Sequence, residues 1–474
     1  MAGLTLNITT AVDSHPELTM KAHNPATGEL IADYENDTEE ALEDKLEEAQ
    51  QTFESWRERD FTTRAGLMFN AAEVLRDNEQ RYARLMTHEM GKPIEQAKSE
   101  VQKCAWVCDY YAEHAESQLA TEPIETDGSA SGVRYEPLGP ILAVMPWNFP
   151  FWQVFRFAAP NLMAGNVGLL KHAANVPGCA EAIEEVFVEA NFPEAAFQTL
   201  MIGRDLTSKV IADDRVRGVT LTGSVGAGRA VASQAAEQLK PTVLELGGSD
   251  PFVVLEDADL DDVIDQAVLA RTQNSGQSCI AAKRFIVVGD QHDAFVERLE
   301  SALADLTVGD PINEATDIGP MARPDLREEL HEQVTESVEM GAVCRLGGEI
   351  PDEGELAEGA FYPPTLLTHL EPGMPGWSEE TFGPVAAVVR AQNVDHAVRL
   401  ANGSDFGLGA SVWGPKKEAR ELIPRLEAGH VAVNGIVKSD PRLPFGGIKD
   451  SGYGRELSRH GIREFVNAKT YWVE

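Results

Sequence analysis

Short apolar segments alternate with helix-like amphipathic segments between residues 139 and 247. Strands are predicted for ILAVMP, VGLLKH, AFQTLM, RGVTLTG and PTVLELG, and helices for 154–164, 179–190 and 227–239. Because these strands are apolar and rich in β-branched residues, the pattern indicates a parallel sheet that helices cover on both faces.

A second alternation of the same kind follows. PFVVLE, RFIVVG and 386–389 are predicted strands, and the predicted helices are 260–273, 292–306 and 395–401. The segment 39–120 is nearly all helical in pattern, so we expect it to pack on the first unit. Residues 121–136 are polar and become strand-like at VRYEP, and TYWV lies near the C-terminus. These segments predict a small β arm, and because an exposed strand edge invites association, we expect the arm to pair with another subunit.

Length and charge narrow the functional classes. A chain of 474 residues exceeds what one hydrophobic core usually serves, so two or three domains are expected. Its 77 acidic residues against 40 Lys and Arg give a net charge of −37, which repels phosphate backbones and argues against nucleic-acid binding. The acid is spread along the whole chain. Such a distribution of acidic residues resembles that of cytoplasmic proteins of extreme halophiles. It predicts adaptation to concentrated salt, which screens the repulsion between the negative charges of the protein.

The sequence shows no targeting, membrane or metal signal. The longest apolar runs fall far short of the ~20 residues that span a bilayer. The N-terminal stretch MAGLTLNITTAVDSH has no basic and apolar regions of a secretory signal, so a cytoplasmic protein without a membrane partner is expected. Five cysteines make no disulfide framework. Cys104 and Cys108 lie four residues apart in a predicted helix, but no further ligands complete a set, so no metal site is predicted.

Three residues carry candidate chemistry. Cys279, in NSGQSCIAAKR, follows a bend of small residues that lets backbone approach a substrate and leaves the thiol reachable. Glu245, in LELGGSDP, lies between two leucines before a Gly-Gly turn, where desolvation raises a carboxyl pKa toward the range of a general base. Asn148, in MPWNFPFWQVFR, follows the first strand, where its amide can donate to an oxyanion beside the Cys279 N–H.

Ordered motifs make the chain resemble the aldehyde dehydrogenase superfamily. From about residue 140 to residue 456 the motifs are WNFPFWQ, LLKHAAN, LTGSVGAG, LELGGSDP, GQSC, ETFGPV and PFGGIKDSGYGRE, and NPATGEL precedes them. The HAAN and GGSDP variants, with RFAAPNLMAGN, look most like the succinate-semialdehyde dehydrogenases. The resemblance implies an α/β aldehyde dehydrogenase-like fold. Its parts are a Rossmann-type NAD(P)-binding domain (1–120 and 137–247), an α/β catalytic domain (248–445) and a β oligomerisation arm (121–136 and 446–474).

The resemblance also implies a mechanism. The Cys279 thiolate adds to an aldehyde, Asn148 and the Cys279 amide hold the oxyanion, hydride passes to the nicotinamide, and water activated by Glu245 hydrolyses the thioester. The expected reaction is oxidation of succinate semialdehyde to succinate by a homodimer or homotetramer. Two alternatives remain open: a dehydrogenase for another small or aromatic aldehyde, and a catalytically silent structural or ligand-binding protein.

Cofactor residues follow from the same motifs. The positions that match are Trp147, Asn148, Lys171, Gly223, Ser224, Leu246, Glu380 and Phe382. Lys171 resembles the lysine at the adenosine ribose, and the GSVGAG turn directs amides at the pyrophosphate. Ala174 stands where many NAD-preferring relatives carry a ribose-binding glutamate. Its small side chain does not repel a 2′-phosphate and makes no positive contact with one, so the choice between NAD and NADP stays open.

The substrate residues match less completely. Arg156 and Ser439 correspond to an arginine and a serine that bind the substrate carboxylate in better-known relatives, and a carboxylate needs such donors. Gln273 replaces their second arginine, so Lys438 and Arg442 are considered as compensating cations. The alternative role of Arg156 is structural, namely an ion pair with an acidic residue at the surface.

Overall fold

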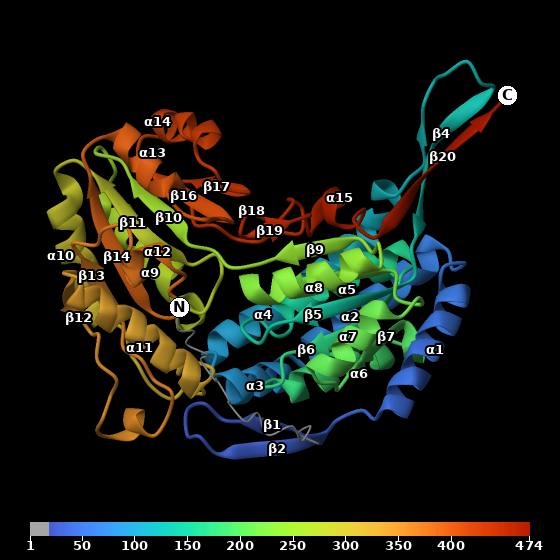
Figure 1. The fold of residues 1–474 in the computed structure, drawn as a ribbon, viewed down its shortest axis with the longest axis horizontal. Helices are drawn as coiled ribbons and strands as arrows, with labels where there is room; N and C mark the ends of the chain where they lie inside the picture. The colour runs from blue at the N-terminus through green and yellow to red at the C-terminus, as the bar shows by residue number, and fades with distance from the viewer. Residues whose placement is uncertain (1–18) are drawn as a thin grey trace, which may run out of the picture.

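The computed structural model describes residues 19–474 and has two lobes with a projecting arm (Figure 1). The N-terminal stretch on which the cytoplasmic prediction depends lies outside the described residues. Among residues 19–474, no helix combines the length and the apolar character needed to cross a membrane. The described chain begins with a hairpin of β1 (Thr19–His23) and β2 (Leu30–Glu35).

The first lobe is built on a six-stranded sheet in the order β19-β9-β8-β5-β6-β7. All five strands predicted between residues 139 and 247 occur, and they run parallel. They are β5 (Pro140–Met145), β6 (Val167–His172), β7 (Phe197–Thr199), β8 (Gly218–Thr222) and β9 (Thr242–Glu245). The short β19 (Gly452–Tyr453) comes from the C-terminal region and pairs antiparallel with β9.

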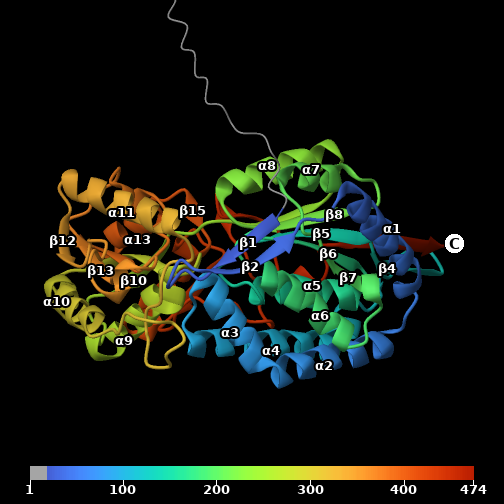
Figure 2. The ribbon, with the colours of Figure 1, turned by 90° about the horizontal axis from the view of Figure 1, so that it is seen from below.

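Helices cover both faces of this sheet, as the alternating pattern predicted (Figure 2). The helices within the alternation are α5 (Trp152–Ala164), α6 (Pro177–Glu189), α7 (Arg204–Ala212) and α8 (Val225–Glu237). The helical N-terminal region forms α1 (Glu39–Trp56), α2 (Phe61–Asp77), α3 (Glu79–Met90) and α4 (Ile94–Gln118). Helix α4 packs on α5, so the prediction that this region lies on the first unit is confirmed.

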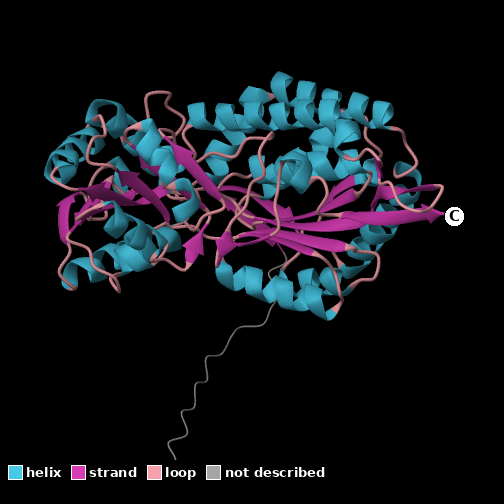
Figure 3. Cartoon of the chain, turned by 90° about the horizontal axis from the view of Figure 1, so that it is seen from above, coloured by secondary structure: helices cyan, strands magenta, loops and turns pink. Residues whose placement is uncertain are grey.

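The second lobe is built on a seven-stranded sheet in the order β12-β13-β14-β11-β10-β16-β17. Helices lie on both sides of its strands (Figure 3). Its strands are β10 (Asp250–Val254), β11 (Ala282–Val288), β12 (Val343–Leu346), β13 (Thr365–Thr368), β14 (Val385–Ala391), β16 (Gly409–Trp413) and β17 (His430–Val433). Its longer helices are α9 (Leu260–Thr272), α10 (Gln291–Ala304), α11 (Pro324–Glu339) and α13 (Val394–Asn402). The predicted strands and helices of this region occur, and α11, β12, β13, β16 and β17 are added to them.

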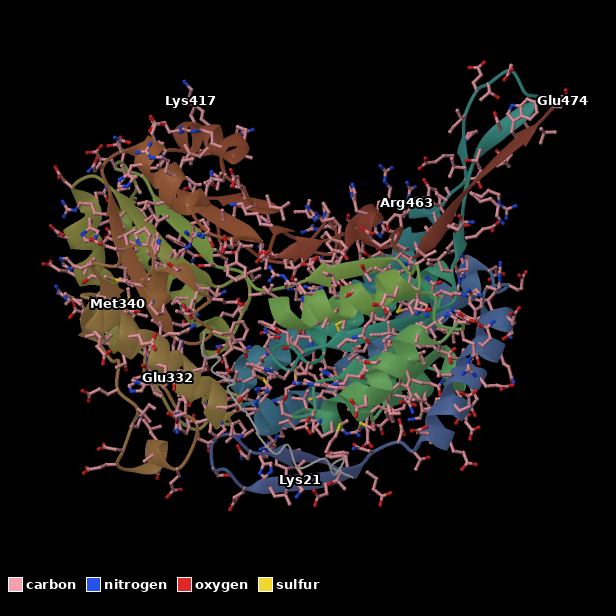
Figure 4. The ribbon with its side chains drawn as sticks, in the orientation of Figure 1. Lys21, Glu332, Met340, Lys417, Arg463 and Glu474 are labelled. Atoms are coloured by element: carbon pink, nitrogen blue, oxygen red, sulfur yellow. The ribbon has the colours of Figure 1, made fainter. Side chains whose placement is uncertain are left out.

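The arm consists of β3 (Glu122–Pro123), β4 (Ala130–Pro137) and β20 (Val466–Val473). Strand β20 pairs antiparallel with β4 over its whole length, so VRYEP and TYWV do belong to one β arm, with VRYEP paired to 466–470 and TYWV to 130–133. In Figure 4, Arg463 lies where β20 leaves the first lobe and Glu474 lies at the tip. The neighbouring β18 (Ile448–Lys449) and β19 pair with β15 (Phe406–Gly407) and β9 instead. The domain boundaries themselves stay predictions.

The ends of strands from both lobes bring the candidate residues together. Asn148 follows β5, Gly223 follows β8, Glu245 ends β9, and Cys279 lies between α9 and β11. The carboxyl edge of a parallel sheet is where loops gather around a ligand, because each strand ends there and its backbone turns away.

Candidate active site

Cys279 follows a backbone segment in an unusual conformation. Asn274, Ser275 and Gly276 have φ values of 57°, 53° and 75°, a left-handed run that disfavours side chains. The run is fixed by bonds to other elements: Asn274 Nδ2 donates to the Asn148 carbonyl at 2.7 Å, and Ser275 Oγ accepts from the Gly319 N–H at 3.0 Å. Such strain persists only where surrounding contacts hold it, and it is frequent at functional sites.

The thiol of Cys279 opens into a cavity of about 180 Å³. Most predicted cofactor residues line the same cavity, namely Trp147, Asn148, Gly223, Ser224, Leu246, Glu380 and Phe382. Burial raises the pKa of the Cys279 thiol to about 12, while the positive charges of Lys283 and Arg156 oppose that rise. Lys283 Nζ donates to the carbonyls of Ser278 and Cys279, each at 2.8 Å, and so fixes the backbone that carries the thiol.

The Gly-Gly turn after Glu245 passes very close to this backbone. A Cβ on Gly248 would overlap the Cys279 carbonyl oxygen, and a Cβ on Gly247 would overlap the Glu380 carboxylate. The Gly248 N–H also donates to Glu380 Oε1 at 3.0 Å. Gly248 is therefore required by its close approach to the Cys279 backbone, which places the Glu245 strand against the Cys279 loop, whereas the end of the Glu380 side chain can shift away from Gly247.

Glu245 is buried at the end of β9, and neither carboxylate oxygen accepts a hydrogen bond from a described residue. Burial raises its pKa well above the ordinary value, the Glu456 carboxylate raises it further, and Arg156 lowers it. Burial also raises the pKa of Glu456, which Arg156 again opposes. One arginine thus opposes the pKa rise of two buried carboxyls, and because it pairs directly with Glu456, its charge favours the ionised form of Glu456 more than that of Glu245.

Arg156 does not meet a surface acid. Its guanidinium forms an ion pair with the buried Glu456 carboxylate, lies 4.7 Å from the centre of the Phe445 ring, and donates to Thr222 Oγ1 at 3.4 Å. The charge of this predicted substrate residue is therefore already balanced inside the protein.

Asn148 is buried and held by its neighbours. One amide hydrogen of Nδ2 is donated to the Gln277 carbonyl at 3.1 Å, and the Asn148 carbonyl accepts from Asn274. An amide has two hydrogens, so the second remains for an oxygen atom in the cavity.

The remaining cofactor positions lie along β6 and the start of α8. Ser224 caps α8, with Oγ accepting from the Ala227 N–H at 3.3 Å, and the Gly223 N–H donates to the Glu245 carbonyl at 3.0 Å. Ala174 is exposed and Lys171 is partly buried. Burial lowers the pKa of Lys171, and so does the positive charge of the exposed Arg204 at the first position of α7.

Two of the three predicted substrate residues, Gln273 and Ser439, lie at a second cavity of about 300 Å³. Gln273 lines it, and Ser439 bonds to another of its lining residues, because Lys103 Nζ donates to Ser439 Oγ at 2.7 Å. The two compensating cations considered from the sequence point elsewhere: Lys438 is exposed, and Arg442 pairs with Asp440 at 2.6 Å.

Four further residues contact or electrostatically influence the candidate residues, and the sequence did not single them out: Lys283, Glu456, Arg204 and Lys103. Lys283 and Glu456 lie inside the quoted motifs NSGQSCIAAKR and PFGGIKDSGYGRE, but a motif alone does not tell which of its charges faces the thiol or the base. Arg204 is a lone surface cation in sequence. Lys103 had a usable signal, since Gln96, Ser99 and Lys103 recur at helical spacing next to an apolar stripe.

No group of three or more His, Cys, Asp or Glu with the geometry to hold a metal ion occurs in the described part of the chain. All five cysteines are free thiols, and burial raises the pKa of Cys104 and of Cys108 above the usual range. These two cysteines pack in the apolar core of α4.

Comparison with known proteins gives consistent results. The sequence profile of the aldehyde dehydrogenase family matches residues 11–471. A probable succinate-semialdehyde dehydrogenase (NADP(+)) of Synechocystis sp. is 55% identical over 451 residues, which are 95% of this chain and 98% of that protein. A succinate-semialdehyde dehydrogenase (NADP(+)) of Mycobacterium leprae is 50% identical over 454 residues, with the same coverage of 95% and 98%. The crystal structure of succinic semialdehyde dehydrogenase from Streptococcus pyogenes with NADP⁺ superposes with a TM-score of 0.93 at 37% identity, covering 96% of this chain and 99% of that chain.

Proposed function

The chain belongs to the aldehyde dehydrogenase family, and from that premise we propose that it oxidises succinate semialdehyde to succinate with NADP⁺. The observation that carries the proposal is the shared cavity in which the Cys279 thiol meets the predicted cofactor residues. The substrate and the cofactor are those of the two succinate-semialdehyde dehydrogenases (NADP(+)) described above, which are 50–55% identical to the chain over nearly its whole length.

The residues present fit a dinucleotide phosphate. A Cβ added to Gly226 would meet no atom within 4 Å, and one added to Gly223 would meet only a Leu221 methyl group at 3.6 Å. The space beside the backbone at the start of α8 is therefore open, and a pyrophosphate can approach its N–H groups. Lys171 and Arg204 together offer two positive charges for a 2′-phosphate, and Ala174 places no carboxylate there. When bound, NADP⁺ accepts the hydride that leaves the aldehyde carbon.

Cys279 is the proposed nucleophile. Its sulfur forms a bond to the aldehyde carbon, and the carbonyl oxygen takes up negative charge that the Cys279 N–H and the free Asn148 amide hydrogen stabilise. The thiol gives its proton to solvent water before this step, so that the thiolate is the species that attacks. Burial disfavours the thiolate by raising the thiol pKa, and the positive charges of Lys283 and, more weakly, Arg156 oppose that effect in part.

Glu245 is the proposed general base for the second half of the reaction. After hydride has left, Cys279 holds the acid as a thioester. A water molecule gives one proton to Glu245 and attacks the acyl carbon, and the C–S bond breaks to release succinate and the thiolate. The raised pKa of Glu245 makes the carboxylate a stronger base once it is ionised.

A steady-state comparison tests this proposal. The rate of NADPH formation at 340 nm is measured with succinate semialdehyde, acetaldehyde and benzaldehyde, with NAD⁺ replacing NADP⁺ in parallel. We expect the highest kcat/KM with succinate semialdehyde and NADP⁺, and no activity in Cys279→Ala. Equal kcat/KM for the three aldehydes would contradict the proposed substrate, and equally inert wild type and variant would contradict the catalytic role.

We also propose that the arm joins copies of this chain into a dimer or tetramer, with 121–136 and 446–474 as oligomerisation segments. The arm projects away from the first lobe (Figure 1), and its Trp472 and Ile124 side chains are 53% and 51% exposed. Exposed apolar side chains on a strand pair with free edges are typical of a surface that a partner covers. Light scattering on the full chain and on Trp472→Lys tests this, since a monomeric wild type would contradict it.

A further inference from the structure

Lys103 occupies an unusual position for a lysine. It lies on α4, partly buried, and lines the 300 Å³ cavity together with Phe149, Trp152 and Gln273. Its Nζ lies 4.1 Å from the centre of the Trp152 ring and donates to Ser439 Oγ at 2.7 Å. These two contacts fix the ammonium group at the wall of the cavity.

No carboxylate of residues 19–474 forms an ion pair with Lys103, although the chain is rich in acid. The two acids whose charges act on Lys103 are engaged elsewhere: Glu100 pairs with the buried Lys92 and accepts from two backbone N–H groups at the start of α5, and Asp440 pairs with Arg442. Burial and then Arg156 lower the pKa of Lys103 to about 8, while weaker influences raise it, namely those of Cys104, Glu100 and Asp440. A poorly solvated cation without a counter-ion is costly, so its presence calls for a negative partner that is not part of the chain.

The cavity beside Lys103 adjoins the one that holds the Cys279 thiol. The segment 146–153 lines both, with Trp147 and Asn148 on the thiol cavity and Phe149 and Trp152 on the other. Gln96 Oε1 of α4 accepts from the Asn274 N–H at 2.6 Å, which ties this face of α4 to the loop that carries Cys279. An aldehyde held at the thiol can therefore direct its far end toward α4.

We propose that Lys103 is the residue that recognises the remote carboxylate of the substrate, with Ser439 and Gln273 as neutral donors beside it. The inference rests on the proposed function and names the cation that selects a carboxylate-bearing aldehyde. Lysine has three N–H donors. One is donated to Ser439, which leaves the Ser439 O–H free to donate to the same carboxylate. Arg156 does not supply this charge, because Glu456 already balances it.

The test compares wild type, Lys103→Met and Lys103→Arg with two aldehydes of equal chain length, succinate semialdehyde and butanal. Lys98→Met is the matched control, because Lys98 lies on the same helix but pairs with the exposed Glu95 and Glu314. For Lys103→Met we expect the ratio of kcat/KM for succinate semialdehyde to that for butanal to fall at least about 30-fold, mainly through KM. Lys103→Arg should recover part of the ratio, and Lys98→Met should leave it unchanged.

A second measurement separates recognition from a structural role. Inhibition by the product succinate should weaken about as much as KM rises in Lys103→Met, while its melting temperature should equal or exceed that of wild type, since a poorly solvated charge is removed. Equal losses with both aldehydes, or unchanged KM for succinate semialdehyde, would overturn the role of Lys103 alone. A wild type without preference for succinate semialdehyde over butanal would contradict the proposed substrate and this inference together, because nothing in the cavity would then select a carboxylate.

Discussion

The substitution Glu456→Gln should move the pH dependence of thioester hydrolysis. Glu456 is the largest influence on the pKa of Glu245 after burial, and it raises that pKa because a second negative charge nearby is unfavourable. Glutamine removes this charge and keeps an oxygen for the Arg156 guanidinium. The full positive charge of Arg156 then acts on Glu245. Both changes lower the pKa of Glu245.

The size of the effect follows from the usual influence of one neighbouring charge on a buried carboxyl. A charge within about 4–6 Å moves a carboxyl pKa by about 1–3, equivalent to about 1.4–4 kcal/mol. Glu245 acts as a base when ionised, so the hydrolysis that it assists is lost as the pH falls through its pKa. A lower pKa in the variant therefore moves the acidic limb of the profile about one to three pH units toward acid.

The assay is the hydrolysis of p-nitrophenyl acetate, in which acylation of Cys279 gives a burst of nitrophenol and the later steady rate reports hydrolysis of the thioester. Glu464→Gln is the graded comparison, since Glu464 raises the pKa of Glu245 less than Glu456 does. It should shift the limb in the same direction by a smaller amount. An acidic limb in Glu456→Gln that stays in place or moves toward higher pH would refute the assignment of the charge to Glu456.

Further predictions concern backbone approach, cofactor choice, pH and salt. Gly248→Ala should lower kcat about 100-fold, because the added Cβ displaces the Cys279 carbonyl and small misplacements of a nucleophile are costly; unchanged kcat would contradict the close approach. Arg204→Ala should raise KM for NADP⁺ about tenfold and leave KM for NAD⁺ unchanged, because only NADP⁺ carries the 2′-phosphate; steady-state assays with each cofactor measure both values. KM for succinate semialdehyde, but not for butanal, should rise above pH 8, where the Lys103 ammonium loses its proton. With a net charge of −37, the melting temperature should rise between 0.1 and 2 M KCl, because the screening length falls from about 10 Å to below 3 Å; a flat curve would argue against salt adaptation.

Much of the architecture is local in origin and therefore visible in the sequence. The strands from β5 to β9 are apolar, β-branched runs, and the helices between them carry the complementary amphipathic pattern, so each element is specified within its own segment. The strands that were missed, such as β12 and β17, are short and half exposed, and their identity depends on the neighbour that they pair with. The pairing of β19 with β9 joins residues more than 200 positions apart, and no local pattern encodes it.

The candidate site likewise has residues that the sequence alone points to and contacts that only the tertiary structure decides. Sequence motifs alone were enough to propose Cys279, Glu245 and Asn148 as nucleophile, base and amide donor, because these chemical types stand at recognisable turns. Only the tertiary structure decided which charges surround them. It paired Arg156 with Glu456 inside the protein and turned the unpaired ammonium of Lys103 toward the second cavity. Charge balance in a buried site depends on distance and burial, which are set by elements far apart in the chain, whereas the sequence records only which charges are present.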